Sequence, residues 1–212
     1  MRLRLIAVAT IAALAAVPAP SNAAAPKKPQ VVDAATDSLG GQGAAEIVSA
    51  VWSTTGQTTV TKVRGKKKVT YEPKKLVVTL NLAGAPGDAP FYYEASAEVA
   101  GCGSVRFTYT PGTVYSQIVS DSMLWYDCGE PDATTGDTLT LVPGVTLKAG
   151  PKSLTWEYPI KAFPKSVRAG SVFTDFRVEA DVIDPVRGLY GPGELAGTPL
   201  DVGTGTGAWK LG

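Results

Sequence analysis

Alternation of apolar and polar residues is the strongest local pattern in this chain. In residues 76–82, three leucines and a valine occupy every second position. A period of two places such side chains on one face of a β-strand. Residues 91–100 show the same alternation, and turn-forming glycine, proline and aspartate lie between the two runs at 84–88. We therefore expect these two strands to form a hairpin.

Further runs rich in β-branched and aromatic residues are separated by turn formers, at 46–55, 58–63, 105–110, 114–119, 123–127, 138–142, 145–148, 154–160 and 172–182. Only 161–167 suggests a helical turn, which Pro164 limits. This pattern predicts an all-β fold, an antiparallel β-sandwich of jelly-roll or immunoglobulin-like type with about 8–10 strands. A small barrel is the competing architecture.

The N-terminus has the layout of a secretory signal peptide. Arg2 and Arg4 precede an apolar run, and small residues follow up to Ala23, where we place the cleavage, with Ala25 as the alternative. The run at 5–17 is shorter than the ~20 residues that a membrane-spanning helix needs. We expect a secreted, extracellular protein with no transmembrane segment.

The remaining chain predicts one domain. Residues 1–23 would be the signal peptide and 24–30 a flexible leader. Residues 31–212 would form a single sandwich, because half of that length holds too few strands to bury a core. The tail from Gly188 is rich in glycine and proline, which predicts a loop, and Trp209 near its end is expected to dock back on the sandwich.

Charge and histidine content exclude several function classes. The chain has 20 Lys+Arg and 19 Asp+Glu, a balance that argues against a nucleic-acid binder. It has no histidine, which removes Ser-His-Asp and Cys-His catalysis, His-bearing zinc sites and His-ligated haem. The two cysteines, Cys102 and Cys128, are most simply a disulfide in an exported protein; two free thiols are the alternative.

Several residues together resemble secreted actinobacterial β-sandwich proteins that are similar to DOMON domains and family-9 carbohydrate-binding modules. The matching pieces are Asp33 and Asp37 before Gly40-Gly41, the segment 46–52, the strands 76–82 and 91–99, the two cysteines, the segment 154–159, Phe163-Pro164 and Gly170. The resemblance implies a sandwich that binds sugars, haem or calcium. Haem conflicts with the lack of histidine and with Met123 as the one methionine after the signal segment.

Three groups of residues are candidates for binding. Asp33, Asp37 and Glu46 offer the hard oxygens that calcium prefers; the alternative is that Asp33 and Asp37 are solvated loop residues. The segment 62–75 holds seven basic residues and suggests an exposed hairpin tip, either for an anionic envelope polymer or membrane headgroups or as protection of a sheet edge. Aromatic residues without an evident core position offer faces for a sugar, or rim the core: Tyr92, Trp125, Tyr126 and Trp209.

We therefore expect a non-enzymatic binding module for an extracellular glycan or an anionic cell-envelope polymer, with calcium as the one candidate cofactor. The alternative is a structural or protein-interaction sandwich without a small ligand. A carboxylate-based glycoside hydrolase is a further alternative. Its candidate acids form two groups: Asp127, Glu130 and Asp132, and then Asp175, Glu179, Asp181 and Asp184.

Overall fold

A computed structural model describes residues 28–34, 37–38, 43–63, 66–86, 91–110, 113–114, 117–118, 121–127, 139–142, 145–163, 167–182 and 200–212. The predicted signal peptide and its cleavage at Ala23 lie outside these residues, as do the tail positions 183–199.

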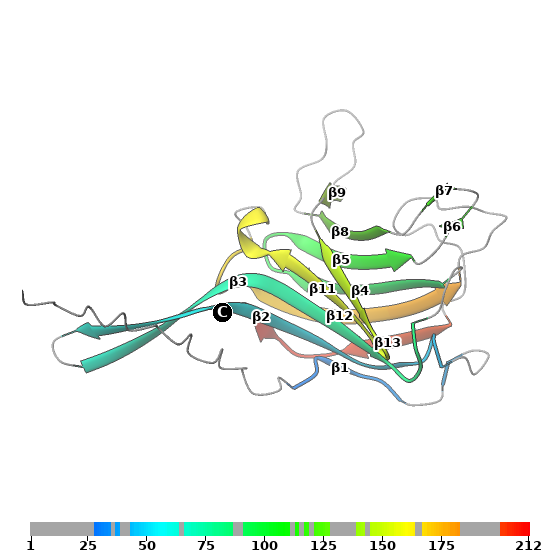
Figure 1. The fold of residues 1–212 in the computed structure, drawn as a ribbon, viewed down its shortest axis with the longest axis horizontal. Helices are drawn as coiled ribbons and strands as arrows, with labels where there is room; N and C mark the ends of the chain where they lie inside the picture. Colours follow the sequence, from blue (N-terminus) through cyan, green and yellow to red (C-terminus); the bar gives the residue numbers. More distant parts are fainter. Residues whose placement is uncertain are drawn as a thin grey trace, which may run out of the picture.

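Two antiparallel sheets lie face to face, which confirms the predicted β-sandwich; they do not close into a barrel (Figure 1). The first sheet has, in spatial order, β1 (Val31–Val32), β2 (Ile47–Val63), β3 (Lys66–Leu82), β11 (Ser153–Pro159) and β10 (Thr146–Gly150). The second has β13 (Asp201–Gly205), β12 (Val172–Val182), β4 (Phe91–Val99), β5 (Gly103–Thr110), β8 (Asp121–Asp127) and β9 (Leu139–Val142), with β14 (Trp209–Lys210) also on β12. Strands β6 (Thr113–Val114) and β7 (Gln117–Ile118) pair separately, and η1 (Ile160–Ala162) is a single 3-10 turn.

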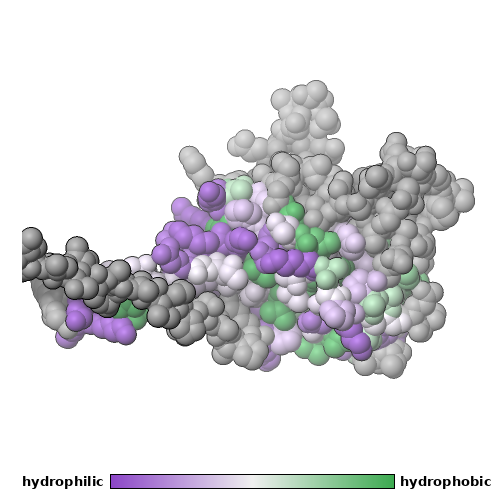
Figure 2. All heavy atoms as spheres, viewed as in Figure 1, coloured by the Kyte–Doolittle hydropathy of each residue, from purple (hydrophilic) through white to green (hydrophobic). Residues whose placement is uncertain are grey.

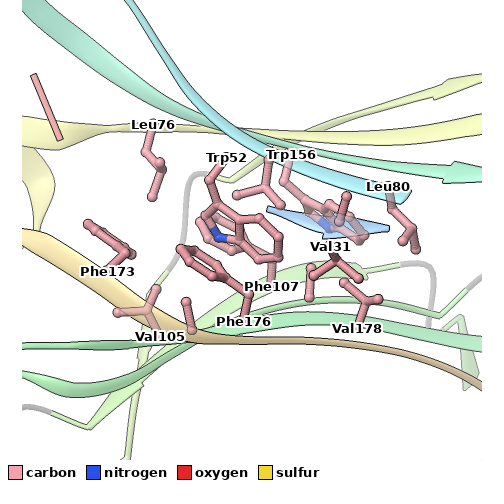
Figure 3. Close-up of a cluster of buried hydrophobic side chains, with 14 of the residues drawn as sticks. Val31, Trp52, Leu76, Leu80, Val105, Phe107, Trp156, Phe173, Phe176 and Val178 are labelled. Atoms are coloured by element: carbon pink, nitrogen blue, oxygen red, sulfur yellow. The ribbon is translucent and has the colours of Figure 1, made fainter. Parts of the chain in front are cut away.

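The core lies between the sheets and is built from the positions that alternate along each strand. Leu76, Val78 and Leu80 are fully buried, as the period of two predicts. Aromatic rings join the layers: the centroids of Trp52 on β2 and Phe176 on β12 lie 4.8 Å apart (Figure 3). The packed rings make one hydrophobic core from residues distant in sequence.

The predicted hairpin between 76–82 and 91–100 is wrong. Strand β3 pairs with β2 on one side and β11 on the other, whereas β4 lies in the second sheet between β12 and β5. Both edges of β3 are therefore occupied along 76–81, and the chain crosses to the facing sheet. The turn residues at 84–88 signalled a change of direction but not the partner of the next strand.

Strands β2 and β3 are much longer than the sandwich needs. The two predicted strands at 46–55 and 58–63 are one continuous strand of 17 residues, paired with β3 from Ile47↔Leu82 to Val63↔Lys66. The outer part of this hairpin extends away from the two layers as a two-stranded ribbon (Figure 1). We call residues 55–63 and 66–75 the arm.

A β-bulge marks the root of the arm. The register shifts between Thr55 and Gly56, which pairs with Pro73. A Cβ atom on Gly56 would lie 2.1 Å from the carbonyl oxygen of Glu72, so only glycine fits there.

The two predicted flexible ends are partly ordered. Gln30, assigned to the leader, receives a hydrogen bond from the Trp52 amide at its side-chain oxygen, 2.7 Å away. The predicted loop of the C-terminal tail contains β13 and β14, both paired with β12. Trp209 packs its ring against Phe173 at 5.3 Å between centroids, which confirms that it docks on the sandwich.

Candidate functional site

Three aspartates from two distant segments meet where the sheets come together at one edge. Asp33 follows β1, Asp37 lies in the next loop, and Asp201 begins β13. One carboxylate oxygen from each lies within 4.8 Å of the others. Gly203 permits the approach, because a Cβ there would lie 2.9 Å from Val31 and 3.4 Å from the Asp33 carboxyl carbon. We call Asp33, Asp37 and Asp201 the carboxylate cluster.

The carboxylate cluster is electrostatically strained. Burial, together with the negative charges of Asp33, Asp37 and Glu46, raises the pKa of Asp201 from 3.8 to about 6, although its Oδ2 accepts a 2.5 Å hydrogen bond from the Ile47 amide. Burial also raises the pKa of Asp33. Oδ2 of Asp33 is buried and has no hydrogen-bond partner among the described residues. Such an arrangement offers hard oxygens to a cation.

The structure modifies the predicted set of calcium ligands. Asp33 and Asp37 come together as expected, but the third carboxylate of the cluster is Asp201 instead of Glu46. Glu46 is buried nearby, and its Oε2 accepts a hydrogen bond from the Ser38 amide at 3.2 Å. Asp201 lies in a glycine-rich stretch far along the chain, where no local pattern connects it with Asp33.

The arm is rich in exposed, positively charged side chains. Its described residues include six lysines and a single acid, Glu72, which pairs with Lys74. All described side chains at 55–62 and 66–72 are exposed. Where grey atoms do not cover the arm, Figure 2 shows hydrophilic residues beside a small hydrophobic patch. The strand register thus confirms the predicted basic hairpin, whose turn at 64–65 lies outside the described residues.

One face of the arm carries apolar side chains. Cross-strand partners share a face, so Val60 and Val69 lie opposite each other, two positions from the pair Thr58 and Tyr71. Both valines are more than half exposed and Tyr71 is 40% exposed. The phenolic hydroxyl of Tyr71 donates to the Thr54 hydroxyl at 3.1 Å, and Thr54 is buried at the root of the arm. This face continues the core-facing side of the first sheet.

Of the four predicted sugar-binding aromatics, the two whose side chains the structure describes, Tyr92 and Trp209, lie far apart. Tyr92 lies outside the core on the outer face of the second sheet, but it is only 8% exposed, and its hydroxyl donates to Glu94 at 2.7 Å. Trp209 lies on the core side. It pairs with Phe173 of β12, whereas Tyr92 pairs with Asp181, eight residues further along that strand, which corresponds to about 26 Å. Trp125 and Tyr126 lie in β8, but their side chains are outside the described part of the structure.

The outer face of the second sheet holds a polar network. Burial raises the pKa of Glu94, which lies opposite Glu179 in the strand register. Glu179 also pairs with Arg177, and Asp181 is buried. Asp175 does not continue the row formed by Glu179 and Asp181, because it lies in the β-bulge of β12, where its backbone has φ +50°.

The other acids of the hydrolase hypothesis are not described. Positions 128–138 and 183–199 lie outside the described residues, and so does the side chain of Asp127. The glycoside hydrolase hypothesis therefore stays a prediction from the sequence.

Cys102 is buried, and the described residues include no free cysteine. Its predicted partner, Cys128, lies outside them, so the pairing stays a prediction. Among the described elements, no helix has the length and apolar character needed to cross a membrane.

Comparison of the chain with protein-family models, with curated proteins and with solved structures gives no match in any of the three. The resemblance to DOMON domains and family-9 carbohydrate-binding modules therefore stays a prediction.

Proposed function

We propose that this protein is a secreted, non-enzymatic binding module that attaches to an anionic polymer of the cell envelope through its arm. The observation that supports this is the ribbon beyond the sandwich, with six lysines and one paired acid on exposed strands. A single exposed lysine binds an anion weakly, but several along one ribbon act together on a repeating polyanion.

The alternative is protein interaction. Within the described residues, no strand pairs with the outer edge of β2 beyond Val51, and none pairs with the edge of β3 that faces away from β2 between 66 and 74. Such open edges accept an added strand from another protein. Lysines also protect edges against pairing, so the charge of the arm favours the polyanion over strand addition.

Binding of the secreted protein to fluorescent polyglutamate, polyuronate and neutral dextran tests the proposal. We expect both polyanions to bind, dextran not to bind, and affinity to fall as salt rises. Changing lysines 66–68 to glutamine should weaken binding roughly tenfold or more. The matched control is Lys152→Gln, Lys161→Gln and Arg168→Gln, which removes the same charge from exposed positions on the sandwich.

Failure of both polyanions to bind the wild type refutes the proposal. An equal loss in the control triple variant would mean that net charge, and not the arm, drives binding. Retained binding in the arm variant would contradict it as well.

We also propose calcium as the cofactor of this module, held by the carboxylate cluster. The proposal is supported by the buried, unpartnered Oδ2 of Asp33 and by the proximity of three carboxylates. A cation would relieve their repulsion. Excess calcium at neutral pH should raise Tm by roughly 5–10 °C and chelator should reverse this, whereas Asp201→Asn should abolish most of the shift. An unchanged Tm in the wild type removes calcium from the proposal.

A further inference from the structure

Tyr71 is the one exposed aromatic residue of the arm in the described part of the chain, and its ring is held in place. Its hydroxyl is tied to the buried hydroxyl of Thr54, so the side chain lies back toward the sandwich. The residue nevertheless stays 40% exposed. A tyrosine fixed by a hydrogen bond presents a flat apolar surface with little loss of side-chain entropy on binding.

Positive charge lies on the same face of the ribbon. The register places Tyr71, Val69 and Lys67 at every second position of β3, with Lys62 opposite Lys67. At about 3.3 Å per residue, Tyr71 and the two lysines lie roughly 13 Å apart. A ligand lying along this face would meet an aromatic ring first, then two valines, then two ammonium groups.

We propose that this face binds an anionic glycan, a polymer that carries sugar rings together with carboxylates or phosphates, with Tyr71 stacking on a ring and Lys62 and Lys67 pairing with the acids. The inference rests on the proposed function and narrows its partner class. A polyanion without rings would use the lysines alone and leave the ring of Tyr71 unoccupied. The charge complementarity of the arm and the fixed aromatic surface beside it favour the sugar-bearing polymer.

A pair of probes with the same acid group tests this inference. Polyuronate carries carboxylates on sugar rings, and polyglutamate of matched length carries them on a peptide. Tyr71→Leu, which keeps an apolar side chain, should weaken polyuronate binding about fivefold and leave polyglutamate binding unchanged. Tyr71→Phe keeps the ring but loses the hydroxyl that fixes it, so its affinity for polyuronate should lie between those of the wild type and Tyr71→Leu. Thr70→Val, on the same strand but on the opposite face, is the control and should bind both polymers as the wild type does.

The outcomes separate this inference from the proposed function. If the lysine variant loses both polymers but Tyr71→Leu loses neither, the inference is wrong and the function stands. If Tyr71→Leu weakens binding of both polymers equally, Tyr71 stabilises the ribbon and does not contact the sugar, and the inference is wrong. If the wild type binds anionic vesicles but neither polymer, both proposals fail. Circular dichroism of each variant, compared with the wild type, shows that the sandwich remains folded.

Discussion

Asp201→Asn should stabilise the protein at neutral pH in the absence of metal. Asparagine keeps an oxygen that accepts the hydrogen bond from the Ile47 amide, and it removes one negative charge from beside Asp33 and Asp37. Asp201 is only 5% exposed, so water does little to screen that charge. The substitution therefore tests the electrostatic strain of the carboxylate cluster without deleting its buried side chain.

The magnitude follows from linkage. Asp201 has a pKa of about 6 in the folded protein against an ordinary value of 3.8. A pKa difference of roughly 2 units corresponds to about 3 kcal/mol. Because the folded pKa is the higher one, the folded state binds the proton more tightly. The stabilising contribution of that proton is complete below pH 3.8 and is lost as pH rises through 6.

Urea unfolding in chelator at several pH values between 4 and 7.5 measures this effect. The difference in unfolding free energy between Asp201→Asn and the wild type should grow by about 2–3 kcal/mol from the acidic to the neutral end. Asp175→Asn, at an exposed aspartate outside the cluster, should show no such growth. A constant difference for Asp201→Asn across this range would refute the assigned strain.

Three further predictions concern the sandwich. Trp52→Ala empties the contact with Phe176 and should lower the unfolding free energy by about 3–5 kcal/mol in urea titrations. Hydrogen bonds from Lys148 and Lys75 lower the pKa of Glu157, so its carboxylate stabilises the fold above pH 4.5 and this effect fades as pH falls further. Glu157→Gln should therefore lower the unfolding free energy by about 0.5–1 kcal/mol at pH 7 and by less in acid, as measured by the same urea titration. Mass spectrometry of the secreted protein should show Cys102 linked to Cys128, and reduction should lower stability by about 3–4 kcal/mol, whereas two free thiols would contradict the predicted cross-link.

Local pattern was enough to identify most strands and their buried faces. The alternation at 76–82 and 91–99 predicted which side chains face the core, because successive residues of a strand point to opposite sides whatever the strand pairs with. It also predicted the basic hairpin, because strand formers stand on both sides of a glycine and a lysine run. The docking of Trp209 followed from the position of a large aromatic residue near the chain end.

Only the tertiary structure decided which strands pair and which side chains meet. The period of a strand does not encode its partner, so β3 and β4 were wrongly joined in one hairpin although they belong to facing sheets. Asp201 reaches Asp33 because strand β13 lies at the edge next to β1, with a glycine at the contact. Likewise, residues beyond Gly56 look like ordinary strand in sequence. They form an arm because this part of the hairpin extends away from the two layers, and the extent of those layers depends on contacts between segments far apart in the chain.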